Sequence, residues 1–165
     1  MEISASEELV DLAADGFDAG IRLGQFIAAD MVAVRLKKPF PLIIVGSPEY
    51  YARSGRPERP EDLRRHACLR MRRRRARIWS LNDNGRTIEI AVSGPFIAND
   101  FPTMLGAALE GPGLAQVPAP IATGAVTAGK LVRVGPLAPM TPGVFLYYPG
   151  HRQIMPKLRA FIDHW

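Results

Sequence analysis

The stretch from residue 97 to residue 118 constrains the fold of this chain more than any other. Asn99 or Asp100 can cap a helix, because a short side-chain oxygen accepts hydrogen bonds from the unpaired N–H groups of a first helical turn. Pro102 fits that turn, where its missing N–H costs little. Apolar side chains then recur at the spacing of one helix face, at Phe101, Met104, Leu105, Ala108 and Leu109. The pattern predicts a helix over residues 101–109.

A second strand follows this helix. Gly111 and Gly113 favour a stop, and residues 114–117 form a short apolar run that is typical of a buried strand. One helix therefore begins where a strand ends, and the next strand ends at Val117 and Pro118. Ligands of open α/β sheets bind at such strand ends. The helix start also carries a partial positive charge and unpaired N–H groups, which favour an anion.

Composition places the chain among globular proteins and excludes several other classes. Of its 165 residues, 47% are hydrophobic and 22% are charged, which is neither disordered nor fibrous composition. No apolar run reaches the roughly 18 residues that a membrane span needs. The single cysteine, Cys68, cannot form an internal disulfide and fits a reducing, cytoplasmic location. The histidines lack metal-ligand spacing, so we expect no metal and no cofactor.

Catalysis is disfavoured by the residues present. His66 and Cys68 lie two positions apart, but a Cys–His nucleophile also needs an orienting group and an oxyanion hole, and the sequence indicates neither. We therefore predict that the chain is not an enzyme.

Positive charge is concentrated in one segment. The net charge is +5, yet residues 53–77 hold eleven arginines against Glu58, Glu61 and Asp62, so the remainder is slightly acidic. Such a run can bind phosphates. It can equally be a solvated strand edge, where charges discourage edge-to-edge pairing. The lack of interleaved aromatic residues and of a recognition helix favours the solvated edge, but both interpretations stay open.

The remaining elements are predicted from short apolar runs and turn residues. Strands are predicted at 2–5, 17–24, 31–36, 42–45, 67–71, 77–81, 88–92, 130–134 and 144–148, and helices at 6–14, 49–53, 121–128 and 154–165. Ser47 can cap the helix at 49–53, and Asn84-Gly85 predicts a two-residue hairpin turn. The strand–helix–strand order of the first 24 residues favours a parallel sheet.

Breaks at residues 46–48 and 136–143 suggest that the chain leaves one sheet and later returns to it. We therefore predict a discontinuous first lobe, 1–45 plus 144–165, and a second lobe, 46–143. Two lobes that share two connections form a cleft and can close by hinging.

Six segments, in order, resemble the effector-binding domain of LysR-type transcriptional regulators. They are DAGIRLG (18–24), VGSPEY (45–50), RPEDLRRHACL (59–69), GPFIAND (94–100), GKLVRV (129–134) and FLYYP (145–149). The resemblance covers nearly the whole chain. It implies an α/β, type II periplasmic-binding-protein-like fold, with two Rossmann-like lobes joined by two crossovers and an effector cleft between them.

The resemblance also implies a set of effector-binding positions: Ser6, Arg22, Gly24, Ser47, Pro48, Asn99, Asp100, Phe101, Val117 and Pro118. From the residues alone, capping explains Ser47, Asn99 and Asp100 equally well. Arg22 could clamp a carboxylate or pair with a neighbouring acidic residue. Because a carboxylate repels an anion, we expect Asn99 and the backbone, rather than Asp100, to face an anionic ligand.

The chain departs from the family pattern at its start. No winged helix-turn-helix or linker helix precedes the domain, and the first strand and helix of the regulatory domain are missing, so the first lobe is expected to be N-terminally truncated. The leading hypothesis is a sensing domain that binds a small organic, anionic inducer and controls transcription. It would form a homo-oligomer, contact no membrane, and reach DNA only through the absent helix-turn-helix domain. The alternatives are a truncated interaction or dimerisation remnant and, less favoured, a small α/β enzyme.

Overall fold

The computed structural model describes residue 12 and residues 16–24, 27–72, 77–83, 85–134, 139–150 and 154–164. It divides into two compact units. The larger contains the described residues of Pro41–Pro139, and the smaller contains those of Glu8–Phe40 and Met140–Trp165. The predicted strand at 2–5 and, apart from Leu12, the predicted helix at 6–14 lie outside the described residues, and Ser6 lies outside them too.

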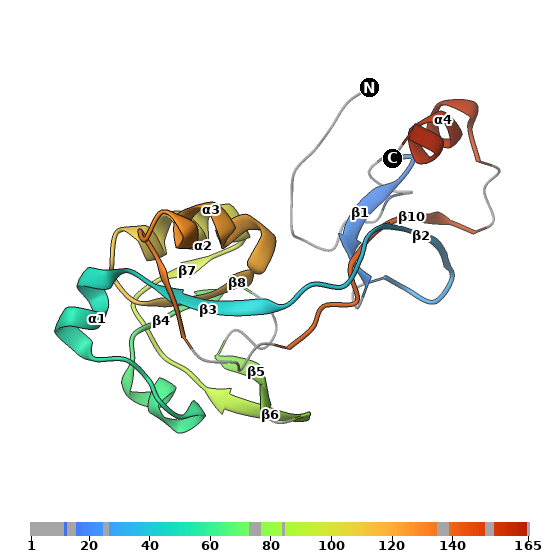
Figure 1. Ribbon diagram of the computed structural model, residues 1–165. Coiled ribbons are helices and arrows are strands. Elements are labelled where there is room, and N and C mark those ends of the chain that lie inside the picture. The colour runs from blue at the N-terminus through green and yellow to red at the C-terminus, as the bar shows by residue number, and fades with distance from the viewer. Residues whose placement is uncertain are drawn as a thin grey trace. The chain divides into compact units, whose positions relative to one another are not determined.

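A five-stranded mixed sheet forms the centre of the larger unit (Figure 1). Its order is β7 (Ile97–Ala98), β4 (Cys68–Met71), β8 (Leu114–Pro118), β3 (Leu42–Gly46) and β9 (Val132–Val134). Strand β4 runs parallel to both β7 and β8, whereas β3 runs antiparallel to both β8 and β9. Strand β3 therefore points the opposite way from the other four strands.

Helices α2 (Phe101–Leu109) and α3 (Ala119–Thr127) cover one face of this sheet. Successive side chains of a strand point to opposite faces, and Ala115 and Val117 of β8 pack with Met104, Ala108 and Ala122 of the two helices. These side chains are almost completely buried. Met104 and Ala108 therefore lie on the core face of α2 as predicted, and Phe101 and Leu105 pack partly buried against the same core, whereas Leu109, the last residue of the predicted stripe, is 36% exposed.

The other face is covered by three elements. They are helix α1 (Pro48–Ser54), the 3-10 helix η2 (Pro60–Arg65), and a hairpin of β5 (Ile78–Asp83) and β6 (Arg86–Ala91). Leu114 and Ile44 of the sheet pack there against Tyr50, Leu63 and Trp79. Asp83 pairs with Arg86 across a two-residue turn, which confirms the predicted hairpin. The larger unit thus has three layers.

The smaller unit contains a three-stranded sheet of order β1 (Gly20–Leu23), β10 (Val144–Pro149) and β2 (Met31–Lys37), together with helix α4 (Pro156–His164). Both outer strands are antiparallel to β10. A Cβ added at Gly20 would lie 2.5 Å from Cζ of Tyr147, and one at Gly24 would lie 2.6 Å from Cε2 of Phe145. The two glycines therefore make room for the aromatic rings of β10.

The boundaries of the units differ from the predicted ones by a few residues. Strand β3 is hydrogen-bonded between β8 and β9, so residues 42–45 belong to the sheet of the larger unit. The division falls at Pro41, before β3, rather than after residue 45, and it falls again at Pro139 rather than at residue 143. The parallel partner expected for the strand at 17–24 is not seen, because β1 pairs with the antiparallel β10 among the described residues.

Candidate functional site

Four strand ends and one strand start lie at a single edge of the larger sheet, which we call the carboxyl edge. Met71 pairs in parallel with Ala98, so β4 and β7 end together. The parallel β8 ends at Pro118, which pairs with Leu42 at the start of β3. Strand β9 also ends there, since it runs antiparallel to β3. This is the edge at which open α/β sheets bind ligands.

Helix α2 begins at the carboxyl edge and is capped by Asp100. One carboxylate oxygen of Asp100 accepts a hydrogen bond from the Thr103 N–H at 2.7 Å, and the other accepts from the Thr103 hydroxyl at 2.8 Å. Of the two predicted caps, Asp100 therefore does the capping. Asn99 comes directly after β7 and is exposed, so its carboxamide can meet a ligand.

Helix α3 also begins at this edge, directly after β8. The Ala119 N–H donates to the Pro41 carbonyl at 2.9 Å, which ties the start of α3 to the start of β3. Val117 is fully buried beneath the helices, Pro118 is buried, and Phe101 is half-buried against the core. The side chains of these three residues therefore pack beneath the edge and present no polar atoms to it.

The electrostatics of the carboxyl edge are less favourable to anions than a bare helix start would be. In α2, Pro102 has no N–H and that of Thr103 is taken by Asp100, whose carboxylate also adds negative charge. In α3, Pro120 lacks an N–H and that of Ala119 is taken by Pro41. Both helix starts keep the positive end of their dipole, but they offer few free donors.

Ser47 and Pro48 lie at the opposite edge of the sheet. Because β3 is antiparallel to β8, its carboxyl end reaches the start of β8, and Val45 pairs with Ala115. Ser47 comes five residues after Leu42, which corresponds to about 17 Å along an extended strand. The structure therefore does not bring Ser47 and Pro48 together with Asn99.

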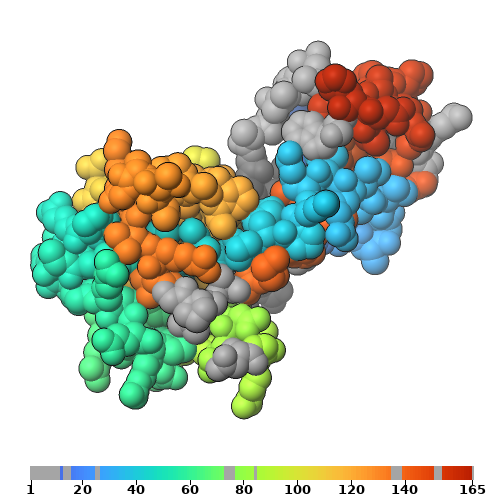
Figure 2. Space-filling model, in the orientation of Figure 1, coloured from blue at the N-terminus to red at the C-terminus, as the bar shows by residue number. Residues whose placement is uncertain are grey.

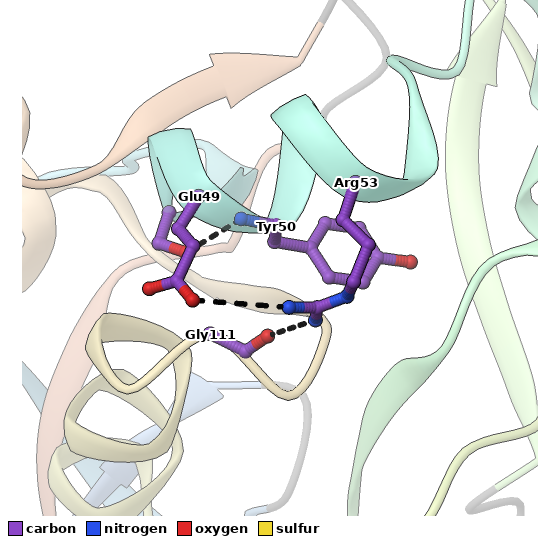
Figure 3. A network of polar contacts seen from close by, with 5 residues as sticks. Glu49, Tyr50, Arg53 and Gly111 are labelled. Carbon is purple, nitrogen blue, oxygen red and sulfur yellow. Dashed lines mark hydrogen bonds and ion pairs between the residues drawn. The ribbon is translucent and has the colours of Figure 1, made fainter.

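The role of Ser47 at that edge is structural. Its hydroxyl accepts from the Tyr50 N–H at 3.1 Å, so the predicted cap of α1 is confirmed, and the residue is only 4% exposed. Figure 3 shows the neighbouring contacts, in which Arg53 donates to the Gly111 carbonyl at 3.0 Å and lies 3.9 Å from the Glu49 carboxylate. This network holds α1 against the turn that precedes β8.

Arg22 and Gly24 belong to the smaller unit. The guanidinium of Arg22 lies 5.8 Å from the centroid of the Tyr147 ring, within cation–π range. The sequence interpretations, a carboxylate clamp or an acidic partner, did not include this aromatic contact. The Gly24 N–H donates to the Gly143 carbonyl at 3.2 Å, and the Phe145 ring fills the space that a side chain would need.

His66 and Cys68 form no nucleophilic pair. Cys68 is completely buried, and burial raises the pKa of its thiol to about 12, so the reactive thiolate is not populated at neutral pH. Nδ1 of His66 instead lies 2.9 Å from the hydroxyl oxygen of Tyr50. The same hydroxyl accepts a hydrogen bond from the Ala67 N–H at 3.0 Å. Burial lowers the pKa of His66, so its ring stays neutral inside this network. The described part of the chain contains no group of three or more His, Cys, Asp or Glu side chains that could hold a metal ion.

Sequence reasoning missed Pro41 and Leu42 at the carboxyl edge. Their position depends on the direction of β3, which an apolar run alone does not reveal. The available signal was the proline pair around Phe40, which marks a connection immediately before the strand.

The mixed α/β sheet, the strand ends gathered at one edge and the two-unit division define a regulatory domain of the type II periplasmic-binding-protein-like class. The regulatory domain of AphB from Vibrio vulnificus has the same fold, with 27% identity over 91% of this chain and 75% of that one, and a TM-score of 0.72. The regulator CrgA from Neisseria meningitidis matches in fold, with 22% identity and a TM-score of 0.80 over 93% of this chain and 53% of that one. The chain belongs to the LysR substrate binding domain family, whose model matches residues 1–165.

The relatives of this chain include bacterial transcriptional regulators. A putative transcriptional regulator of Pseudomonas aeruginosa is 36% identical over 157 residues, covering 93% of this chain and 51% of the relative. The HTH-type transcriptional regulator PgrR of Escherichia coli is 32% identical over 167 residues, covering 99% of this chain and 56% of the relative. The chain thus spans about half the length of these relatives. The predicted family and fold class are confirmed, and the family is one of regulators rather than enzymes. Within the described ranges, no helix is both long and apolar enough to cross a membrane.

Proposed function

We propose that this chain senses a small organic effector at the carboxyl edge of its larger unit and thereby controls transcription through a DNA-binding domain in the complete regulator. One observation carries the proposal: β7 and β8 end, β3 begins, and α2 and α3 start at the same edge of one sheet. Family membership supports a sensing role, because the relatives are transcriptional regulators. Such a regulator would act in the cytoplasm, where its DNA lies.

Asn99 is the side chain proposed to contact the effector. Its carboxamide is exposed and offers two donors and an acceptor, whereas Asp100 is occupied by its capping bonds. A carboxylate on the effector would accept from Asn99 and lie toward the start of α3, away from the negative charge of Asp100. The proposed effector is therefore a small organic acid. Ser47 and Pro48 are not part of this site, because they lie at the other edge of the sheet.

The proposed mechanism is a population shift. An effector that binds one arrangement of the domain more tightly than another raises the population of that arrangement by its differential affinity. The attached DNA-binding domains would respond to the shift, and the coupling would be reciprocal between effector and DNA. The resemblance assigns the effector to a cleft between two lobes, and the carboxyl edge is the contribution proposed for the larger unit.

Thermal unfolding in the presence of small organic acids and their neutral amides tests the proposal. A compound that binds only the folded state raises the melting temperature in proportion to the logarithm of its concentration. We expect organic acids to do so, Asn99→Ala to weaken the best one, and Asn99→Asp to weaken it further by adding like charge. Thr87→Ala, an exposed change on β6, is the control and should leave binding unaltered. If no compound raises the melting temperature, the interaction-remnant alternative gains support. If a compound binds and both Asn99 variants bind it normally, the site is not at this edge.

We also propose that the chain self-associates through α2 and α3. Neither of these two nine-residue helices contains an ionisable side chain, although 22% of the chain is charged. Leu109 and Ile121 on these helices, and Ile97 on the neighbouring β7, are 36%, 40% and 44% exposed. Sedimentation velocity should show a dimer that Ile121→Glu shifts to monomer. Ile21→Glu, at an exposed position of the smaller unit, is the matched control and should leave the dimer intact.

A further inference from the structure

The two faces of the larger unit differ in charge. Residues 48–91 contain twelve arginines, no lysine and six acidic residues. Apart from β4, which belongs to the sheet itself, their described elements, α1, η2 and the β5–β6 hairpin, pack on the sheet face opposite α2 and α3. In Figure 2, η2 and the hairpin (green to yellow-green) form the lower part of the unit and α1 (teal) lies at its left, with α2 and α3 in yellow and orange above. Charge is thus separated onto one face by the fold itself.

The exposed arginines of this side form a surface that we call the arginine face. Its described members, all exposed, are Arg53, Arg56, Arg59, Arg64, Arg65, Arg77 and Arg86. Arg72, which follows β4, lies instead at the carboxyl edge, where its N–H donates to the Ala98 carbonyl at 2.6 Å. Only Arg53 has a described acidic partner, Glu49, at 3.9 Å. The carboxylate of Asp62 accepts from the backbone N–H groups of Glu58 and Arg59, and its negative charge lies near Arg59 and Arg65. Apart from Arg53, no member of the arginine face forms an ion pair with a described carboxylate, so these guanidinium groups can bind an external anion.

The kind of partner follows from what the arginine face lacks. None of the exposed large hydrophobic residues of the described chain lies on α1, η2, β5 or β6. Stable protein interfaces need buried aromatic or aliphatic anchors, and membrane-surface elements need an apolar face that inserts into the lipid. A phosphate backbone needs neither. Guanidinium groups suit phosphates well, because their planar fork donates two parallel hydrogen bonds to phosphate oxygens.

We propose that the arginine face binds the phosphate backbone of duplex DNA without sequence preference. Relatives of this chain are HTH-type transcriptional regulators, so the full-length protein works beside DNA. Among the described residues of this side there is no base-reading element, since a seven-residue helix, a short 3-10 helix and a hairpin turn do not fill a major groove. The contact would add affinity and salt dependence to a regulator whose sequence preference comes from another domain. This goes beyond effector sensing, which is assigned to a different part of the unit.

Fluorescence anisotropy of a labelled random-sequence duplex, titrated with the 165-residue chain at several KCl concentrations, tests the proposal. The logarithm of the binding constant should fall linearly with the logarithm of salt, with a slope of about −0.9 for each phosphate contacted. The double variant Arg64→Gln/Arg65→Gln should reduce the slope by about 2, since each lost contact removes roughly one unit. At about 0.1 M salt, each lost contact should weaken binding on the order of eightfold.

Two controls make the result decisive. Lys130→Gln/Arg133→Gln removes the same charge from exposed positions after α3 and on β9, and should leave the slope unchanged. Arg64→Lys/Arg65→Lys keeps the charge and should keep the slope, which separates a contact effect from loss of folding. The proposal is overturned if the chain does not bind at low salt, if both charge-removing variants weaken binding equally, or if single-stranded RNA of the same charge binds more tightly than the duplex. An unchanged melting temperature with organic acids would leave this result unaffected.

Discussion

Replacing Gly113 with alanine should destabilise the larger unit, whereas the same replacement at Gly106 should stabilise it. Gly113 lies just before β8, where a Cβ would collide with the carbonyl oxygen of Ala67 and would lie 2.9 Å from its carbon. That carbonyl accepts a hydrogen bond from the Leu114 N–H at 2.8 Å, so relief of the collision weakens the contact between β8 and β4. Gly106 lies in the interior of α2, and a Cβ there meets nothing within 4 Å.

The two substitutions are expected to change the free energy of unfolding in opposite directions, and the size of each contribution follows from known magnitudes. An overpacked backbone contact typically costs about 1–3 kcal/mol, and loss of one backbone hydrogen bond adds about 1 kcal/mol. Alanine has less conformational freedom than glycine in the unfolded chain, which stabilises the folded state by about 0.5–1 kcal/mol. The expected net loss in unfolding free energy for Gly113→Ala is therefore about 1–3.5 kcal/mol. At position 106, the higher helix propensity of alanine should raise the free energy of unfolding by about 0.5–1 kcal/mol.

Urea unfolding followed by tryptophan fluorescence measures both changes. The chain has two tryptophans, so a Trp165→Phe background leaves Trp79, which is 5% exposed in the core of the larger unit, as the only reporter. The unfolding midpoint should fall for Gly113→Ala by on the order of 1 M urea and rise modestly for Gly106→Ala. Equal shifts of the same sign, or a Gly113 variant as stable as the parent, would refute the packing argument.

Three further outcomes are expected. Burial lowers the pKa of His66, so as the pH falls the unfolded state takes up a proton before the folded state does. The free energy of unfolding should therefore be constant with respect to this group above about pH 6.5 and decrease as the pH falls below that value. Between about pH 7.5 and 5.5, the urea midpoint of His66→Gln should fall less than that of the parent. Because burial raises the pKa of the Cys68 thiol to about 12, an aromatic disulfide reagent should react with it only after unfolding; rapid stoichiometric reaction of the folded chain would contradict this. Asp100→Ala removes both capping bonds to Thr103 and should cost about 1 kcal/mol in urea unfolding, whereas Asp100→Asn should retain most of that stability.

Local elements were predictable where a single physical signal determines them. The i, i+3, i+4 stripe and a capping side chain defined α2, and the structure places that helix at Phe101–Leu109 with Asp100 as its cap. The Asn-Gly pair defined the β5–β6 turn, in which Gly85 has a φ of 87°. Both features depend on neighbours in the sequence, which is why they can be read without the fold.

The direction of β3 could not be predicted in this way. Residues 42–46 form an apolar run, which is equally compatible with a parallel or an antiparallel neighbour. The antiparallel pairing of Leu42 with Pro118 brings the start of β3 to the carboxyl edge and carries Ser47 to the other edge. Ser47, expected by position to contact the effector, caps α1 at the other edge, whereas Pro41 and Leu42 lie at the carboxyl edge next to the end of β8.

A single antiparallel strand thus determines which residues the larger unit can present together. With β3 reversed, its carboxyl end leads into α1, and the chain continues into η2 and the hairpin on the face opposite α2 and α3. The described residues of the arginine face accordingly lie with α1, η2 and the hairpin on that side, while the uncharged helices α2 and α3 remain on the other. The carboxyl edge lies between these two surfaces, because it is the edge of the sheet that both sets of elements cover. Effector contact, backbone phosphate contact and self-association are therefore proposed for three separate surfaces, and a substitution in one of them should leave the other two activities measurable.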